Sequence, residues 1–151
     1  MTGLNYLLLE LPSKVEYALL ALLEIASQRV ATTPVTVAEI TARHPIPERY
    51  LEQILANLRR GGILKSQRGA KGGYILSKEA HLITILDVVT LIEGDRQAED
   101  TNQELTMEMK LIRSPWQEAN LSAQSILQKY TLADLCQKRA AYLQQGMMYY
   151  I

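Results

Sequence analysis

The sequence of 151 residues contains only one cysteine, Cys136. A single cysteine cannot form a disulfide within the chain, and it excludes a zinc or cluster site held by several cysteines of one chain. No apolar run reaches the roughly 18 residues that a membrane-spanning helix requires. The segment Met1–Pro12 lacks the basic region and the cleavage site of an export signal. We therefore expect a cytoplasmic protein without a membrane partner.

Phenylalanine is absent as well, and glycine and proline are few, with eight and five residues. Hydrophobic residues make up 48% and charged residues 21% of the chain, which is the balance of an ordinary globular protein. A chain of this length forms one domain, or a small domain with an appendage, and needs no disulfide or metal to fold.

The formal net charge is zero, but charges of opposite sign are separated along the chain. Residues 59–78 contain six basic residues and no acidic one, whereas residues 87–108 contain seven acidic residues and one basic residue. Such a basic segment suggests a surface for an anionic partner, with nucleic acid as the first candidate. Two solvated surfaces of opposite charge would produce the same pattern.

Residues 36–62 have the pattern of a helix-turn-helix unit. Thr36, with a glutamate three residues later, predicts a capping box for a short helix that Pro45 ends. A second helix is expected from Pro47, its first residue, to Arg60, with two glycines as the stop. Its apolar residues follow the spacing i, i+3, i+4, i+7, and the opposite face is mainly polar. The apolar set is Leu51, Ile54, Leu55 and Leu58, and the opposite face carries Arg49, Glu52, Gln53, Ala56 and Arg60.

Two more helices are expected on either side of this unit. Ser13, with a glutamate three residues later, predicts a capping box before a helix over 14–28. That helix is apolar almost all round, which is typical of a central buried helix. Thr84 precedes a shorter helix over 85–92.

Between these helices, two short runs with apolar residues, 63–67 and 74–77, flank a segment rich in glycine and basic residues. This pattern predicts a β-hairpin whose basic tip projects as a wing. The glycines from Gly69 to Gly73 do not follow the P-loop pattern, so we interpret them as turn residues that permit positive φ.

The C-terminal third predicts three helices after an acidic loop. The first covers residues 104–113. Ser114 and Pro115 predict a capping box with proline at the first helical position, and the helix that follows carries an apolar stripe on one side. Thr131 caps the last helix. The stripe consists of Trp116, Ala119, Ala123, Ile126, Leu127 and Tyr130.

The second helix of the unit and the hairpin together indicate DNA binding. In the major groove arginine pairs with guanine, glutamine with adenine, and glutamate with cytosine. Arg49, Glu52 and Gln53 lie near the helix N-terminus, the end that usually meets base edges. Arg68 at the hairpin tip is long enough to enter a minor groove. Phosphate contacts are expected from Arg59, Arg60, Lys65 and Lys71.

Catalysis and metal binding find little support. His44 and His81 flank a turn and a loop, and each is interpreted as a surface or cap residue rather than a ligand or base. Cys136 lies in a helix, where a buried structural role is expected. The acidic residues lack the ligand spacing of a cation-binding loop and predict a solvated loop; they are Asp95, Glu99, Asp100, Glu104 and Glu108. No acid, base and nucleophile converge, so we expect no enzyme.

Four motifs occur in order within residues 11–94: LPSKVEYAL from Leu11, IPERYLEQIL from Ile46, KSQRGAKGGY from Lys65 and IEG from Ile92. Together they resemble the Rrf-two family of bacterial winged helix-turn-helix transcriptional regulators. The likeness returns at Trp116 and at residues 131–135. Several ordered motifs make this resemblance far more specific than a lone helix-turn-helix.

The resemblance implies a mainly α fold with a small β-hairpin, divided into three segments. Residues 1–94 would form the winged helix-turn-helix DNA-binding domain. Residues 95–113 would form an acidic loop and short helix equivalent to the effector region. Residues 114–151 would form the dimerisation helix and the C-terminal helix. Two chains would join largely through the helix at about 115–130, with the apolar stripe as the interface.

At the DNA, the resemblance assigns contact positions on the recognition helix and makes Arg68 the wing arginine. The resemblance also places Tyr50 at a contact position of the recognition helix. The residues alone indicate an aromatic side chain at the edge of the core, whose hydroxyl can reach a phosphate. The complete set of expected DNA-binding residues is Arg49, Tyr50, Glu52, Gln53, Arg59, Arg60, Lys65, Ser66, Arg68 and Lys71.

One departure from the family bears on the signal. Members that bind an iron–sulfur cluster carry three closely spaced cysteines after the Glu-Gly pair that corresponds to Glu93–Gly94, and residues 95–113 contain none. Cluster ligation normally needs several thiolates, so we predict no cofactor. The effector would then be a protein partner, a small molecule or the oxidation of a thiol. A cluster shared through Cys136 of two subunits is the remaining alternative.

The sequence therefore predicts a homodimeric DNA-binding transcriptional regulator, a repressor that recognises a pseudo-palindromic operator. The alternative is a winged-helix protein-interaction module that does not bind DNA.

Overall fold

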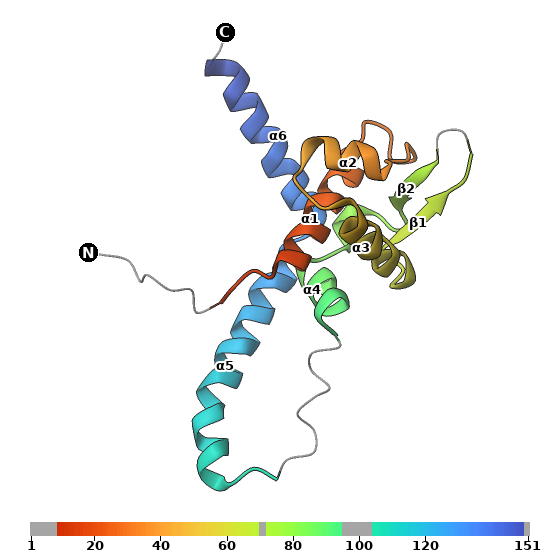
Figure 1. The fold of residues 1–151 in the computed structure, drawn as a ribbon. Helices are drawn as coiled ribbons and strands as arrows, with labels where there is room; N and C mark the ends of the chain where they lie inside the picture. Colours follow the sequence, from red (N-terminus) through yellow and green to blue (C-terminus); the bar gives the residue numbers. More distant parts are fainter. Residues whose placement is uncertain (1–8, 70–71, 95–103, 150–151) are drawn as a thin grey trace.

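The computed structural model describes residues 9–69, 72–94 and 104–149 (Figure 1). Within them the fold is mainly helical with one antiparallel hairpin, which confirms the predicted fold class. The elements are α1 (Ser13–Ala26), α2 (Val37–Arg43), α3 (Glu48–Arg60), β1 (Leu64–Gln67), β2 (Gly73–Leu76), the 3-10 helix η1 (Ala80–Leu82), α4 (Ile85–Glu93), α5 (Met107–Lys129) and α6 (Leu132–Tyr149).

Helix α1 lies at the centre of the core, as its apolar pattern predicts. It packs against α3, α4, α6 and β2. The predicted capping box at its start is wrong, because Pro12 and not Ser13 is the N-cap residue. The Glu16 amide donates to the Pro12 carbonyl at 3.0 Å, and Ser13 is already the first helical residue. Its hydroxyl is therefore one position too late to cap the third amide of the helix.

Helices α2 and α3 form the predicted helix-turn-helix unit. The Thr36 hydroxyl accepts from the Glu39 amide at 3.2 Å, and α2 ends before Pro45 as expected. Pro47 is the N-cap of α3 with extended backbone, so the helix begins one residue later than predicted. The four apolar residues of α3 are completely buried. Burial of four such side chains stabilises the fold by about 1.5–3 kcal/mol each.

The hairpin is attached to the start of α2. Besides the pairing of β1 with β2, Val35 and Tyr74 exchange backbone hydrogen bonds of 3.0 and 2.8 Å. Gly73 has a φ of +156°, and a Cβ there would lie 2.6 Å from the Val35 carbonyl oxygen. This position therefore requires glycine for a close backbone approach. Gly69 also has a positive φ, of +129°, as predicted for the tip.

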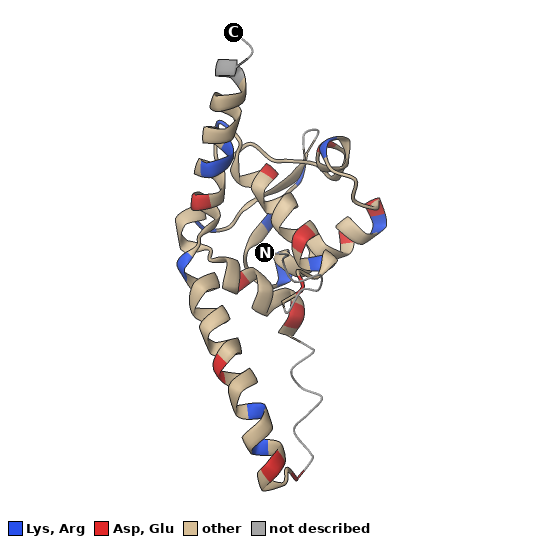
Figure 2. Cartoon of the chain, turned by 90° about the vertical axis from the view of Figure 1, so that its left-hand side faces the viewer, with Lys and Arg blue, Asp and Glu red and all other residues tan. Residues whose placement is uncertain are grey.

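Helices α5 and α6 run end to end as a long rod beside the core (Figures 1 and 2). Their junction is fixed to the core by two backbone hydrogen bonds, from Ile85 to the Tyr130 carbonyl at 2.9 Å and from Leu132 to the Ile83 carbonyl at 2.8 Å. Thr131 caps α6 as predicted, because its hydroxyl accepts from the Asp134 amide at 3.1 Å. The rod therefore holds a defined position relative to the core.

Helix α5 differs from its prediction. The sequence predicts two helices that meet at Ser114, but a single helix runs through Pro115, and Thr106 is its N-cap. The Thr106 hydroxyl accepts from the Met109 amide at 3.2 Å. Pro115 removes the hydrogen bond to the Leu111 carbonyl. Leu111 is exposed, so water can bind that carbonyl and the helix continues. The helix thus crosses the boundary between the predicted segments 95–113 and 114–151.

Candidate nucleic-acid interface

The outer face of α3 is polar and exposed. Arg49, Glu52 and Gln53 are exposed, while the residues on the opposite face fill the core. Because the apolar face fixes the rotation of the helix, these three side chains must point away from the core. Arg59 and Arg60, which end the helix, are exposed as well. The helix thus offers exposed hydrogen-bonding groups to a partner in its first two turns and at its C-terminal end.

Tyr50 lies at the edge of this surface. It is half-buried, and its ring meets that of Tyr17 edge to face, with centroids 5.7 Å apart and an interplanar angle of 86°. Such a pair holds the start of α3 against α1. This environment agrees with the aromatic core-edge position indicated by the residues alone. The DNA contact implied by the family resemblance stays a prediction.

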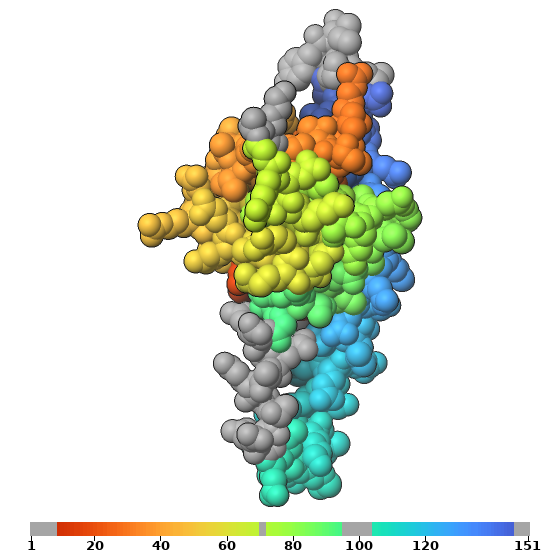
Figure 3. Space-filling view, turned by 90° about the vertical axis from the view of Figure 1, so that its right-hand side faces the viewer, coloured from red at the N-terminus to blue at the C-terminus, as the bar shows by residue number. Residues whose placement is uncertain are grey.

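The hairpin continues the polar surface. Leu64 is buried, whereas Lys65, Ser66 and Gln67 are exposed along β1, and Arg68 follows them. Strand β1 packs against α3. Figure 3 shows α3 and the hairpin, in yellow to yellow-green, side by side on one face. The structure therefore brings the predicted residues of α3 and β1 together; Lys71 lies outside the described residues.

The predicted interface residues of α5 lie elsewhere, on the rod. Trp116 and Ile126 are 69% and 53% exposed, whereas Ala123 and Leu127 are half-buried. The sequence stripe did not include Leu121, which is 65% exposed. Only one charged residue, Glu118, lies between positions 114 and 128. Figure 2 accordingly shows few charged positions in this part of α5.

The candidate catalytic and metal-binding residues are scattered. His44 is the C-cap of α2, as the cap interpretation predicts, and His81 is exposed next to Glu79. Cys136 is half-buried rather than buried, and its sulfur accepts from the Ser27 hydroxyl at 3.6 Å. Within the described residues, no group of three or more His, Cys, Asp or Glu side chains is close enough to hold a metal ion.

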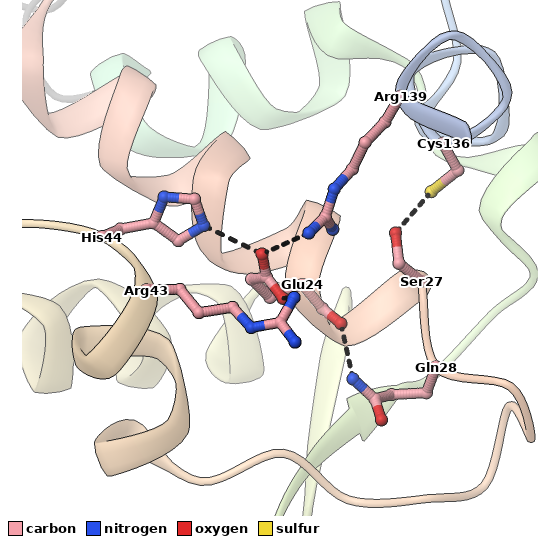
Figure 4. A network of polar contacts seen from close by, with 7 residues as sticks. All are labelled: Glu24, Ser27, Gln28, Arg43, His44, Cys136 and Arg139. Carbon is pink, nitrogen blue, oxygen red and sulfur yellow. Dashed lines mark hydrogen bonds and ion pairs between the residues drawn. The ribbon is translucent and has the colours of Figure 1, made fainter. Parts of the chain in front are cut away.

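The sequence did not reveal the polar centre of the core, Glu24. Its side chain is buried, and its carboxylate lies 2.9 Å from His44 Nε2 and 3.0 Å from Arg139 Nη2 (Figure 4). A longer contact of 3.5 Å joins it to Arg43. The signal that could have indicated it is the position of Glu24 as an acid in an otherwise apolar part of α1. A buried charge at such a position needs partners from other elements.

A helix-turn-helix followed by a basic hairpin defines a winged helix-turn-helix protein. The comparisons give the particular family: the model of the Rrf2 (Rrf-two) family, described as an iron-dependent transcriptional regulator, matches residues 11–138. The chain belongs to this family of helix-turn-helix transcriptional regulators. Its relatives are named regulators and not enzymes, as the sequence predicts. Within the described residues, no helix is long and apolar enough to cross a membrane.

Three relatives illustrate the similarity. An Rrf2-like regulator of Rhodobacter capsulatus is 42% identical over 83 residues, which are 54% of this chain and 55% of that protein. The regulator CymR of Bacillus subtilis is 30% identical over 95% of this chain and all of its own length. Its structure, described as that of the global cysteine regulator, covers 87% of this chain and 98% of its own, with a TM-score of 0.72. The structure of T. potens IscR is 34% identical in sequence and has a TM-score of 0.73. The match covers 94% of this chain and 97% of that chain.

The residues present do not fit a cluster held by three cysteines of one chain. The sequence has one thiol, Cys136, and its position in α6 follows the segment that carries the family's cluster cysteines. Four thiolates are the usual ligand set of such clusters.

Proposed function

We propose that two copies of this chain bind a pseudo-palindromic operator as a homodimer and repress transcription by occupying it. The observation that carries the proposal is the exposed polar surface of α3 and β1. Away from it, α5 carries exposed apolar side chains on one of its sides. The first surface offers groups for DNA, and the second offers area for a second protomer.

The recognition step belongs to α3. Its exposed Arg49, Glu52 and Gln53 are the residue types that read guanine, cytosine and adenine in the major groove. They lie in the first two turns of a helix that begins at Glu48, and this end usually meets base edges. The packing of α3 against α1 fixes the helix, so its polar side is presented in one orientation before DNA arrives.

The hairpin would secure the neighbouring groove. Arg68 follows β1 on the exposed side, and a narrow minor groove attracts such an arginine. Lys65 and Ser66 on β1, together with Arg59 and Arg60, would contact phosphates, which position the protein without reading sequence. Lys71 carries the same expectation from the sequence.

The dimer would form along α5. Besides the exposed Trp116 and Ile126, an apolar pocket of about 430 Å³ lies between the start of α1, α4 and α5. Its lining includes Val89, Ala123 and Leu127. We infer that the α5 helix of a second copy occupies this surface, because the pocket continues the exposed apolar side of α5. Two-fold symmetry would then place one α3 on each half-site.

For the signal, we infer that the regulator acts in the cytoplasm without a cluster of the family's cysteine-ligated kind. A protein or a small molecule would be its effector. The basis is the absence of cysteine from residues 95–113.

DNA binding is tested by measuring affinity for genomic fragments by fluorescence anisotropy over a range of salt concentrations, followed by selection of the tightest fragments. Each phosphate contact adds about 0.9 to the slope of log affinity against log salt. We expect a slope of several units and enrichment of a two-fold symmetric sequence. Weak binding that does not depend on salt would favour a protein-interaction module instead.

Self-association is tested separately by light scattering at micromolar concentration. We expect twice the 17.0 kDa mass of the chain. A monomer at that concentration would contradict the proposed dimer, whatever the DNA result.

A further inference from the structure

A pocket of about 490 Å³ opens between the C-terminal ends of α1 and α2 and the middle of α6. Its volume is in the range of small-molecule sites. The charged residues of its lining are three arginines and one acid: Arg29, Arg43, Arg139 and Glu24. None of the lining residues belongs to α3, the hairpin or α5. The pocket is therefore separate from the surfaces proposed for DNA and for a second protomer.

The charged side chains that line the pocket have a net positive charge. The lining contains three guanidinium groups and one carboxylate, which is an excess of two positive charges. Glu24 is 5% exposed and is already held by His44 Nε2 at 2.9 Å and Arg139 Nη2 at 3.0 Å. Figure 4 shows how these groups converge on its carboxylate. The acid is thus satisfied before the other two arginines are counted.

Arg43 and Arg29 have hydrogen-bond donors that are available to a ligand. Arg43 lies 3.5 Å from the Glu24 carboxylate, which is longer than a good N–H···O bond. Its side chain is also 64% exposed. Arg29 forms no ion pair or side-chain hydrogen bond with another described residue. A guanidinium carries five N–H donors in a fixed fork, which matches a carboxylate or a phosphate.

We propose that this pocket binds a small organic anion, whose carboxylate or phosphate group is held by Arg29, Arg43 and Arg139. The apolar lining residues Ala140 and Leu143 on α6 would contact the remainder of the molecule. Arginine suits this task better than lysine, because its planar fork binds two oxygens of one group.

Such a ligand would act on the connection between the DNA-binding unit and the rod. Arg43 is the last residue of α2, which packs against α3, and Arg139 lies on α6. Both now contact Glu24 of α1. An anion that competes for these two arginines changes how α2 is held to α1 and α6. This coupling to DNA rests on the proposed function.

The binding site is tested without DNA, by titrating the full-length protein with inorganic phosphate and with succinate while recording amide NMR spectra. Succinamide, which has the shape of succinate without its charge, is the control ligand. We expect saturable shifts confined to residues near Arg29, Arg43 and Arg139 with both anions and none with succinamide. Small unsaturable shifts over the whole surface, or equal binding of succinamide, would overturn the site.

A variant pair makes this test specific. Arg29→Gln removes a charge that supports no ion pair in the described parts of the chain, so the fold should be retained. The control, Arg113→Gln on α5, removes the same charge outside the pocket. A lost charged hydrogen bond should weaken anion affinity about tenfold in the first variant and leave it unchanged in the second. Equal affinities in both variants would contradict the assigned ligand residues.

The effector role is tested by reciprocity. If the anion changes DNA affinity by some factor, DNA must change anion affinity by the same factor. Saturable anion binding that leaves DNA affinity unchanged would overturn the effector role. A protein that binds the anion but no DNA would refute the proposed function and not the pocket, because the NMR titration needs no DNA.

Discussion

Helices α3 and α5 both carry an apolar face, but only α3 buries that face completely within its own chain. Leu51 and Leu55 on α3 are 0% exposed, whereas Trp116 and Ile126 on α5 are 69% and 53% exposed. The free surface of α3 is consequently polar and suits DNA, while that of α5 is apolar and suits a second protein surface. The difference shows that the core of the helix-turn-helix unit is complete in one chain, whereas α5 keeps exposed apolar side chains.

The largest effect is expected from a substitution in the buried face of α3. Leu55→Ala should lower the free energy of unfolding by about 2–5 kcal/mol, because a completely buried side chain leaves a cavity. Urea denaturation at a fixed protein concentration measures the change. The control Leu82→Ala removes a leucine that is 56% exposed and should cost less than about 0.5 kcal/mol. Equal costs would contradict the assigned core.

A truncation on α5 should leave the fold and weaken the dimer. Trp116→Ala is expected to raise the dimer dissociation constant at least about 30-fold, since a buried tryptophan anchor contributes about 2 kcal/mol or more. Analytical ultracentrifugation gives this constant. Tyr142→Ala on α6 removes an aromatic side chain of similar exposure, 75%, and should leave the constant unchanged. The prediction fails if both variants dimerise like the parent chain.

The polar face of α3 is tested by how strongly the protein prefers one base pair over another in its operator. Gln53→Ala should remove about 1–3 kcal/mol of discrimination at one base pair per half-site, because a bidentate contact is lost. Binding to a set of single-base operator variants measures this effect. Gln128→Ala on α5 is the matched control and should retain the parent preference. An unchanged preference in the α3 variant would move the recognition face away from Gln53.

The smallest effect is expected on the hairpin. Lys65→Ala should weaken binding to all sequences alike and reduce the salt slope by about one, since one phosphate contact is lost. Lys110→Ala on α5 should leave the slope unchanged. A change in base preference with an unaltered slope would contradict the phosphate role of Lys65.

The sequence predicted those elements whose signals are local. The spacing of Leu51, Ile54, Leu55 and Leu58 identified the buried face of α3, and all four are 0% exposed. Thr36 and Thr131 were identified as caps because their hydroxyls and the backbone N–H donors that they satisfy lie within one turn. The exposure of Arg49 and Gln53 follows from the same periodicity.

The errors arose where one local signal competed with another. Ser13 has the capping-box pattern, but Pro12 precedes it and takes the N-cap position with its restricted φ of −62°. At Ser114–Pro115 the same pattern predicted a helix start inside α5, where exposed backbone tolerates the lost hydrogen bond. Glu24 could not be paired from sequence at all, because Arg43, His44 and Arg139 come from distant positions along the chain.

The most direct test of the account is a hydroxyl-radical footprint of the selected operator. A dimer that joins through α5 and reads DNA with α3 should protect two half-sites related by two-fold symmetry, with centres one or two helical turns apart, about 10–10.5 base pairs per turn. Protection of a single unpaired half-site would contradict the proposed dimer on DNA. The absence of any protected region would contradict DNA recognition by α3.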